Sequence, residues 1–129
     1  MPQPACTLCG DCNTGCNVGA KNTVLMNYLP DAHNHGADIF CQVEVQSIAP
    51  GGAGGGWTAN CQLVGKDAPS DPPLAFPVSA NVLVLAAGTL GTAEILLRTR
   101  ALGAVPMSPA VGRRFGADGD WPVAVPRNT

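Results

Sequence analysis

The residues best suited to chemistry are four cysteines near the start of the chain. They are Cys6, Cys9, Cys12 and Cys16. Their spacing, C-x2-C-x2-C-x3-C, is one by which thiolates hold iron–sulfur clusters. Gly10 and Gly15 would let the backbone wrap around a cluster. Zinc sites usually join two separated cysteine pairs, so the spacing favours iron–sulfur over its alternatives, zinc and metal-free thiols.

The two remaining cysteines, Cys41 and Cys61, stand alone on expected strands, where we predict buried small side chains. The other four are too clustered for an extracellular disulfide framework. The first residues also lack the basic and apolar regions of a signal peptide. We therefore expect reduced thiols and a cytoplasmic location.

The composition favours part of a larger enzyme over a small independent protein. Only 12% of the 129 residues are charged while 46% are hydrophobic, so a separate charged shell is not encoded. The formal net charge of −2 gives no basic surface for nucleic acid. No apolar run reaches the roughly 18 residues of a membrane span, so no transmembrane segment is predicted.

Periodicity predicts a helix followed by a strand meander. Asn22 or Thr23 can cap the helix, and Gly36 can stop it. The glycine-rich residues 51–56 read as a hairpin connection, because the Lys-Ser/Thr of a phosphate loop does not follow. Strands are expected over residues 38–49 and 57–65, with a third beginning at residues 76–78.

A strand–turn–helix pattern follows the meander. Residues 81–88, Asn-Val-Leu-Val-Leu-Ala-Ala-Gly, are apolar without alternation, which predicts a strand of a parallel sheet covered on both faces. A helix is expected over residues 89–103, capped by Thr89 or Thr92 and ended by Gly103. The glycine turn suits close approach of a cofactor to bare backbone, although any α/β domain can contain such a turn.

Four segments in order resemble the glucose–methanol–choline (GMC) family of flavin oxidoreductases, and within it the cholesterol oxidase-like branch. They are Cys9-Gly-Asp-Cys-Asn-Thr-Gly-Cys-Asn-Val-Gly-Ala-Lys-Asn-Thr23, Val43-Glu-Val-Gln-Ser-Ile48, Val82-Leu-Val-Leu-Ala-Ala-Gly-Thr-Leu-Gly-Thr-Ala-Glu-Ile-Leu-Leu-Arg98 and Val111-Gly-Arg-Arg-Phe-Gly-Ala-Asp-Gly-Asp120. The family's G-x-G-x-x-G and its catalytic histidine are missing, so the chain looks like an internal piece of a longer enzyme.

The resemblance implies an incomplete α/β fold, part of an FAD/NAD(P)-binding domain of GMC type. We expect a cysteine-rich loop over residues 1–22, the helix, meander and strand–turn–helix over residues 23–103, and the start of a linker over residues 104–129. It also implies an FAD-dependent oxidation of the CH–OH group of a small alcohol or sterol. The remainder of its own polypeptide would be the partner of this chain.

The resemblance places the flavin nucleotide at two points. A valine of the second segment contacts adenine through its backbone, and Val45 matches it best, with Val43 as the alternative in the neighbouring register. Ala87 and Gly88 correspond to the turn that lies against the nucleotide. No residue of the chain can be assigned as a catalytic base.

The resemblance also bears on the cysteines. Some bacterial flavin dehydrogenases of the family carry an iron–sulfur cluster on a C-x5-C-x3-C set, which Cys6, Cys12 and Cys16 match, with Cys9 as an extra thiol. Two alternatives to the flavoenzyme stay open from the sequence. One is a small iron–sulfur electron carrier, and the other is a zinc-stapled interaction module.

Overall fold

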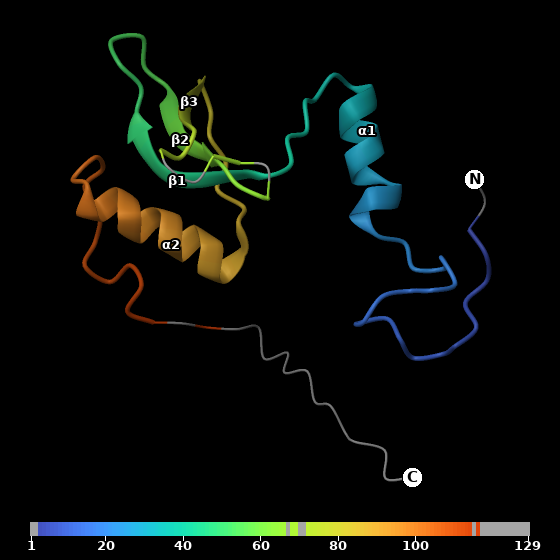
Figure 1. Cartoon of the computed structure of the whole chain (residues 1–129). Coiled ribbons are helices and arrows are strands. Elements are labelled where there is room, and N and C mark those ends of the chain that lie inside the picture. Colours follow the sequence, from blue (N-terminus) through green and yellow to red (C-terminus); the bar gives the residue numbers. More distant parts are fainter. Residues whose placement is uncertain (1–2, 67, 70–71, 115, 117–129) are drawn as a thin grey trace. The chain divides into compact units, whose positions relative to one another are not determined.

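The computed structural model describes residues 3–66, 68–69, 72–114 and 116. The chain divides into two compact units, Met1–Cys41 and Gln42–Thr129 (Figure 1). Of the linker expected over residues 104–129, residue 115 and residues 117–129 lie outside the described residues. The first unit holds η1 (Val24–Met26) and α1 (Tyr28–Asn34), and the second holds β1 (Val43–Pro50), β2 (Trp57–Leu63), β3 (Ala75–Ala80) and α2 (Gly88–Ala101).

In the first unit, the expected single helix is divided into η1 and α1. Capping at Asn22 or Thr23 is wrong for α1, because Asn27 interrupts the helical run and starts α1 itself. The Asn27 side chain accepts a hydrogen bond from the amide of Tyr28, the first residue of α1, so one amide without a helical partner is satisfied. Pro30 stands in the first turn of α1, where its missing N–H has no helical partner to lose.

The predicted glycine stop of this helix is confirmed. The Gly36 amide donates to the His33 carbonyl and the Ala37 amide to the Ala32 carbonyl, both at 3.0 Å. This pair of bonds is the Schellman motif, which satisfies the last helical carbonyls. No residue of η1 or α1 is buried, so the two helices form no hydrophobic core in this unit.

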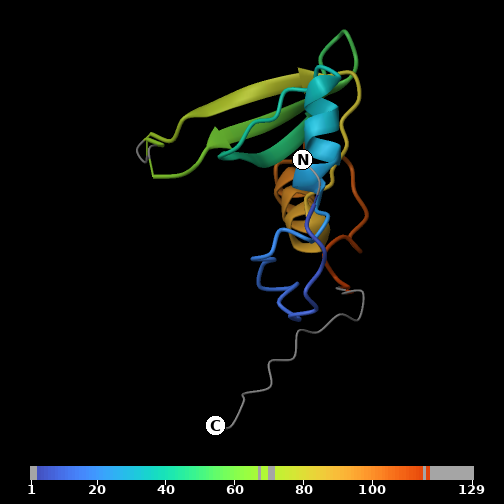
Figure 2. The same cartoon turned by 90° about the vertical axis from the view of Figure 1, so that its right-hand side faces the viewer.

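The second unit contains the predicted meander, with strands in the order β1-β2-β3 and antiparallel pairing throughout (Figure 2). The hairpin connection is confirmed, since the Gly51 amide donates to the Gly56 carbonyl at 2.8 Å. Gly56 has φ +81°, and a Cβ there would lie 2.6 Å from the Ala80 carbonyl oxygen. β1 begins at residue 43 instead of 38, because Gln42 has φ 59°, which breaks an extended run.

The helix α2 packs against β1, and the small core lies between them and β2. The buried apolar side chains are Ile48, Ala59, Cys61 and Ile95. Thr99 of α2 is fully buried, and its Oγ1 accepts a hydrogen bond from the Ile48 amide at 3.0 Å. Among the described residues β1 pairs with β2 alone, so this hydroxyl gives the Ile48 amide an acceptor that no second described strand provides.

Replacing Thr99 by valine tests how far the hydrogen bond from the Ile48 amide to the Thr99 hydroxyl stabilises β1. Valine keeps the shape but leaves the buried Ile48 amide without an acceptor, which costs about 1–3 kcal/mol. We expect amide hydrogen exchange at Ile48, measured by NMR, to accelerate by about tenfold or more. Thr99→Ser retains the hydroxyl and should keep most of the protection. Unchanged protection in Thr99→Val would contradict this role.

The predicted strand over residues 81–88 is wrong for this structure, in which the meander ends at β3 and that segment joins no sheet. Val82 and Val84 are 77% and 80% exposed, whereas Leu83 and Leu85 are half-buried. The exposure thus alternates as in a strand, but no described strand lies alongside. An apolar run encodes burial on both faces, and only neighbouring strands and layers can provide that burial.

The end of α2 agrees with the sequence prediction. The Gly103 amide donates to the Arg100 carbonyl at 3.0 Å and the Ala104 amide to the Thr99 carbonyl at 3.4 Å, which is again a Schellman arrangement. Among the described residues, no helix has the length and apolar character needed to cross a bilayer.

Candidate functional site

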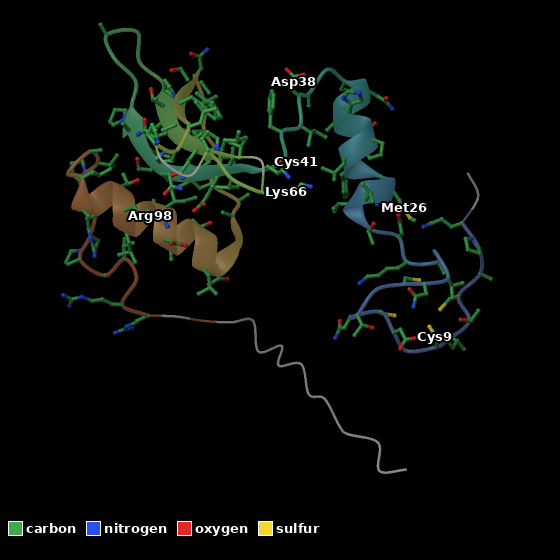
Figure 3. The ribbon with its side chains drawn as sticks, viewed as in Figure 1. Cys9, Met26, Asp38, Cys41, Lys66 and Arg98 are labelled. Carbon is green, nitrogen blue, oxygen red and sulfur yellow. The ribbon has the colours of Figure 1, made fainter. Side chains whose placement is uncertain are left out.

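The four cysteines of the predicted metal site line one cavity of about 220 Å³ in the first unit. Figure 3 labels Cys9 on this loop and draws its sulfur atoms in yellow. Apart from the thiols, the walls include the apolar side chains of Leu8, Val18 and Ala20. The structure therefore brings Cys6, Cys9, Cys12 and Cys16 to one place, as expected of shared ligands.

Hydrogen bonds close the loop around this cavity. The Lys21 ammonium donates to the Cys12 carbonyl at 2.8 Å, and the Gln3 side-chain amide donates to the Lys21 carbonyl at 3.4 Å. The Gly15 amide donates to the Asp11 carbonyl at 3.1 Å. The segments before and after the cysteines are thus tied together, and a positive charge lies on the loop that carries the thiols.

Backbone amides also approach the sulfur atoms. The Leu8 amide donates to Cys6 Sγ at 3.4 Å. The amide of Lys21, followed by those of residues 18–20, lowers the pKa of the Cys16 thiol against an opposing contribution from desolvation. Amides that stabilise a thiolate are what a site for electron-rich sulfur requires.

The predicted burial of the two remaining cysteines is confirmed for one of them. Cys61 on β2 is buried, and burial raises the pKa of its thiol. Cys41 is exposed and belongs to no strand, because β1 begins two residues later. Its prediction as a buried strand residue is therefore wrong.

These opposite pKa shifts predict an order of alkylation in metal-free protein. Because the thiolate is the nucleophile, Cys16 stays reactive at a lower pH than Cys61. With iodoacetamide at about pH 7.5, we expect Cys16 to react at least about tenfold faster, as read by peptide mass spectrometry. Modification of Cys61 before Cys16 would contradict the hydrogen-bonding account.

The cysteine cavity does not have the form of a closed single-ion site. Among the described residues, no group of three or more His, Cys, Asp or Glu side chains is arranged to hold one metal ion. A zinc ion draws its thiolates to about 2.3 Å from a single centre. The four thiols therefore share a cavity without being arranged as the ligands of one ion.

A second hollow, of about 290 Å³, lies between β1 and α2. Val45 and Ala87, two of the three residues predicted to lie against the nucleotide, both line it. Val43, the alternative in the neighbouring register, also lines it, together with Glu44, Gly91, Glu94, Ile95 and Arg98. The structure thus joins two segments that the sequence places 42 residues apart.

Gly88, the third predicted residue, is the first residue of α2 beside this hollow. Its φ of +72° is a conformation that glycine adopts without strain, and no atom lies within 4 Å of the position a Cβ would take. The predicted caps Thr89 and Thr92 are wrong, because Ala87 is the N-cap and makes no side-chain bond. Thr92 Oγ1 instead accepts from the Ala87 amide at 3.2 Å.

Sequence reasoning missed the polar residues that join α2 to β1. Arg98 donates to Gln46 at 3.0 Å and to Glu44 at 3.3 Å, and it also bonds Glu94 on its own helix (Figure 3). Gln46 is the extra residue of a β-bulge, because Val45 pairs with Cys61 and the next paired residue is Ser47. Nothing in the local sequence marks this bulge.

The meander, the glycine turn and the helix packed on β1 make up an incomplete α/β fold of the flavin-binding kind. The family model for GMC oxidoreductases matches residues 3–118. The chain therefore belongs to the GMC oxidoreductase family, as the sequence motifs predicted.

Named relatives agree with this family. Cholesterol oxidase from two strains of Mycobacterium tuberculosis, CDC 1551 and H37Rv, is 37% identical over 114 residues, which is 88% of this chain and 18% of the relative. Cholesterol oxidase from Acinetobacter baumannii is 32% identical over 111 residues, covering 84% and 20% respectively. The chain thus spans about a fifth of the length of these relatives. No solved structure matches it.

The family implies FAD, and the hollow between β1 and α2 fits part of this cofactor. The apolar side chains of Val43, Val45 and Ile95 can contact a planar ring. Open space beside Gly88 permits close approach to bare backbone. The N-terminus of α2 adds partial positive charge near that space.

Proposed function

We propose that this chain is part of an FAD-dependent oxidoreductase that acts on the CH–OH group of an alcohol or sterol. The observation that carries the proposal is the meeting of Val45 and Ala87 in one hollow. FAD, when bound, supplies the hydride acceptor for such a reaction. The residues of this chain would hold the nucleotide half of the cofactor, while the base that takes the hydroxyl proton comes from outside them.

A sterol substrate is supported by the relatives, which are named cholesterol oxidases. In the oxidation, the carbinol carbon gives up a hydride and its hydroxyl gives up a proton, which leaves a carbonyl group.

The test is to purify the complete gene product that contains these residues and to identify the flavin it releases on denaturation. Anaerobic addition of cholesterol in detergent micelles should then bleach the flavin absorbance, with a simple primary alcohol as the comparison. Protein that releases no FAD would refute the proposal. Bleaching by the primary alcohol alone would keep the CH–OH oxidoreductase and exclude the sterol.

A second proposed cofactor is an iron–sulfur cluster in the cysteine cavity. The observation that favours it is the convergence of Cys6, Cys9, Cys12 and Cys16 on one cavity with amides directed at sulfur. A cluster would supply one-electron transfer, which a flavin can feed. Reduced thiols of this kind suit a cytoplasmic location, which we propose on the same ground.

The same preparation also distinguishes the two alternatives to the flavoenzyme, the iron–sulfur electron carrier and the zinc-stapled module. A small electron carrier would contain iron and sulfide without flavin, and a zinc-stapled module would contain zinc and unfold in excess chelator. Metal analysis of protein purified without oxygen distinguishes these outcomes.

A further inference from the structure

Beside the Thr99 bond to the Ile48 amide, Arg98 makes further polar contacts between α2 and β1, and these lie at the hollow. Its Nη1 donates to Gln46 Oε1 at 3.0 Å and to Glu44 Oε1 at 3.3 Å, while its Nη2 bonds Glu94. The planar guanidinium offers several donors in a fixed fork, so one side chain can hold three partners at once. Its side chain is 38% exposed and lines the hollow.

The two β1 partners of Arg98 flank Val45. One of them, Gln46, is the bulge residue, so the β1–β2 ladder has no pair at this point. A bulge re-aims the backbone and leaves its extra residue without a ladder partner. Glu44 and Val45 are held by their ladder partners on β2, whereas Gln46 on the other side of Val45 has none, so its described side-chain contact is the bond from Arg98.

We propose that Arg98 is a positioning residue, which sets the backbone of Val45 against the adenine half of FAD through Gln46 and Glu44. This rests on the proposed function, since it assigns the hollow to the nucleotide. Arg98 acts through its β1 partners and is not assigned a contact with the flavin ring. Its removal should weaken the binding of ligands that contain the adenine half and spare those that lack it.

The test compares FAD with FMN, which carries the same flavin ring without the adenosine. The complete gene product is stripped of flavin, and both dissociation constants are measured by fluorescence quenching. We expect Arg98→Met to weaken FAD binding by about tenfold, which corresponds to loss of charge-assisted hydrogen bonds at a half-exposed site. FMN binding should stay within about twofold, which also shows that the variant folds.

A matched control lies two residues further along the same helix. Arg100 donates to the carbonyls of Ser108 and Val111 and does not line the hollow. Arg100→Met removes the same group from α2, so it should leave the ratio of FAD to FMN affinity unchanged. Arg98→Lys keeps the charge but loses the fork, and we expect it to weaken FAD binding as Arg98→Met does.

A double-mutant cycle decides whether Arg98 acts through Gln46. In a Gln46→Ala background, Arg98→Met should have clearly less effect on the FAD dissociation constant, because the partner it holds is already gone. An additive effect, or an unchanged FAD to FMN ratio in Arg98→Met, would overturn the inference. Failure of the wild-type protein to bind FAD would instead overturn the proposed function.

Discussion

Replacing Ala87 by phenylalanine is expected to abolish stable FAD binding. Ala87 lines the hollow of about 290 Å³ that Val45 also lines, and its own side chain is exposed. A benzyl group there has room to exist in the folded chain but would occupy the space assigned to the nucleotide. We expect the FAD dissociation constant to rise by about a hundredfold or more. The phenyl ring would exclude the nucleotide from the hollow, and the apolar contacts that the nucleotide makes there would be lost.

The control for this variant is Ala101→Phe, the same change near the far end of α2. Ala101 is exposed and does not line the hollow, so the FAD content of purified protein should stay at the wild-type level. Circular dichroism should show the same helix content for both variants. FAD retained at full occupancy in Ala87→Phe would place the nucleotide elsewhere.

The second large effect is expected at the cysteine cavity. Protein purified or reconstituted without oxygen should bind about three or four irons per chain, with the visible absorption of a cluster. Cys16→Ser should remove the cluster, because the thiolate that the amides of residues 18–21 stabilise is lost. Cys41→Ser is the matched control, since Cys41 is exposed and does not line the cavity, and it should keep the full iron content.

The variant Cys9→Ser distinguishes a cluster held by all four cysteines from one held by three. If all four cysteines are ligands, Cys9→Ser should reduce the iron content to about three per chain and change the electron paramagnetic resonance spectrum. If Cys6, Cys12 and Cys16 suffice, the content is about three in wild type and in Cys9→Ser alike. Iron-free wild-type protein after anaerobic reconstitution would exclude both.

The local elements of this chain could be predicted because their signals are local. Gly36 and Gly103 end their helices through bonds that reach only a few residues back, and residues 51–56 close a hairpin between adjacent strands. The apolar run of residues 81–88 is the contrary case. Its composition predicts a covered strand, yet in the structure Val82 and Val84 face solvent because no described strand pairs with them.

In the candidate sites, too, local features could be predicted from the sequence and features that depend on packing could not. The cysteine set was evident from spacing, and the family motifs selected Val45 and Ala87. The bulge at Gln46 and the contacts of Arg98 were missed, because they join β1 to a helix about 50 residues later and depend on how α2 packs. The capping prediction for Thr92 is wrong for a local reason, because α2 begins at Gly88 and the Thr92 hydroxyl accepts from the Ala87 amide in the turn before the helix.

Residue types and spacing identify the groups that could act, which are four thiols at cluster spacing, a glycine turn before a helix, and the motifs of the GMC family. The packing of the chain adds that the four thiols line one cavity, that Cys41 is exposed while Cys61 is buried, and that Val45 and Ala87 line one hollow between β1 and α2. The physical reason is that spacing and turn chemistry act over a few residues. Burial and long-range hydrogen bonds exist only once distant segments have packed together.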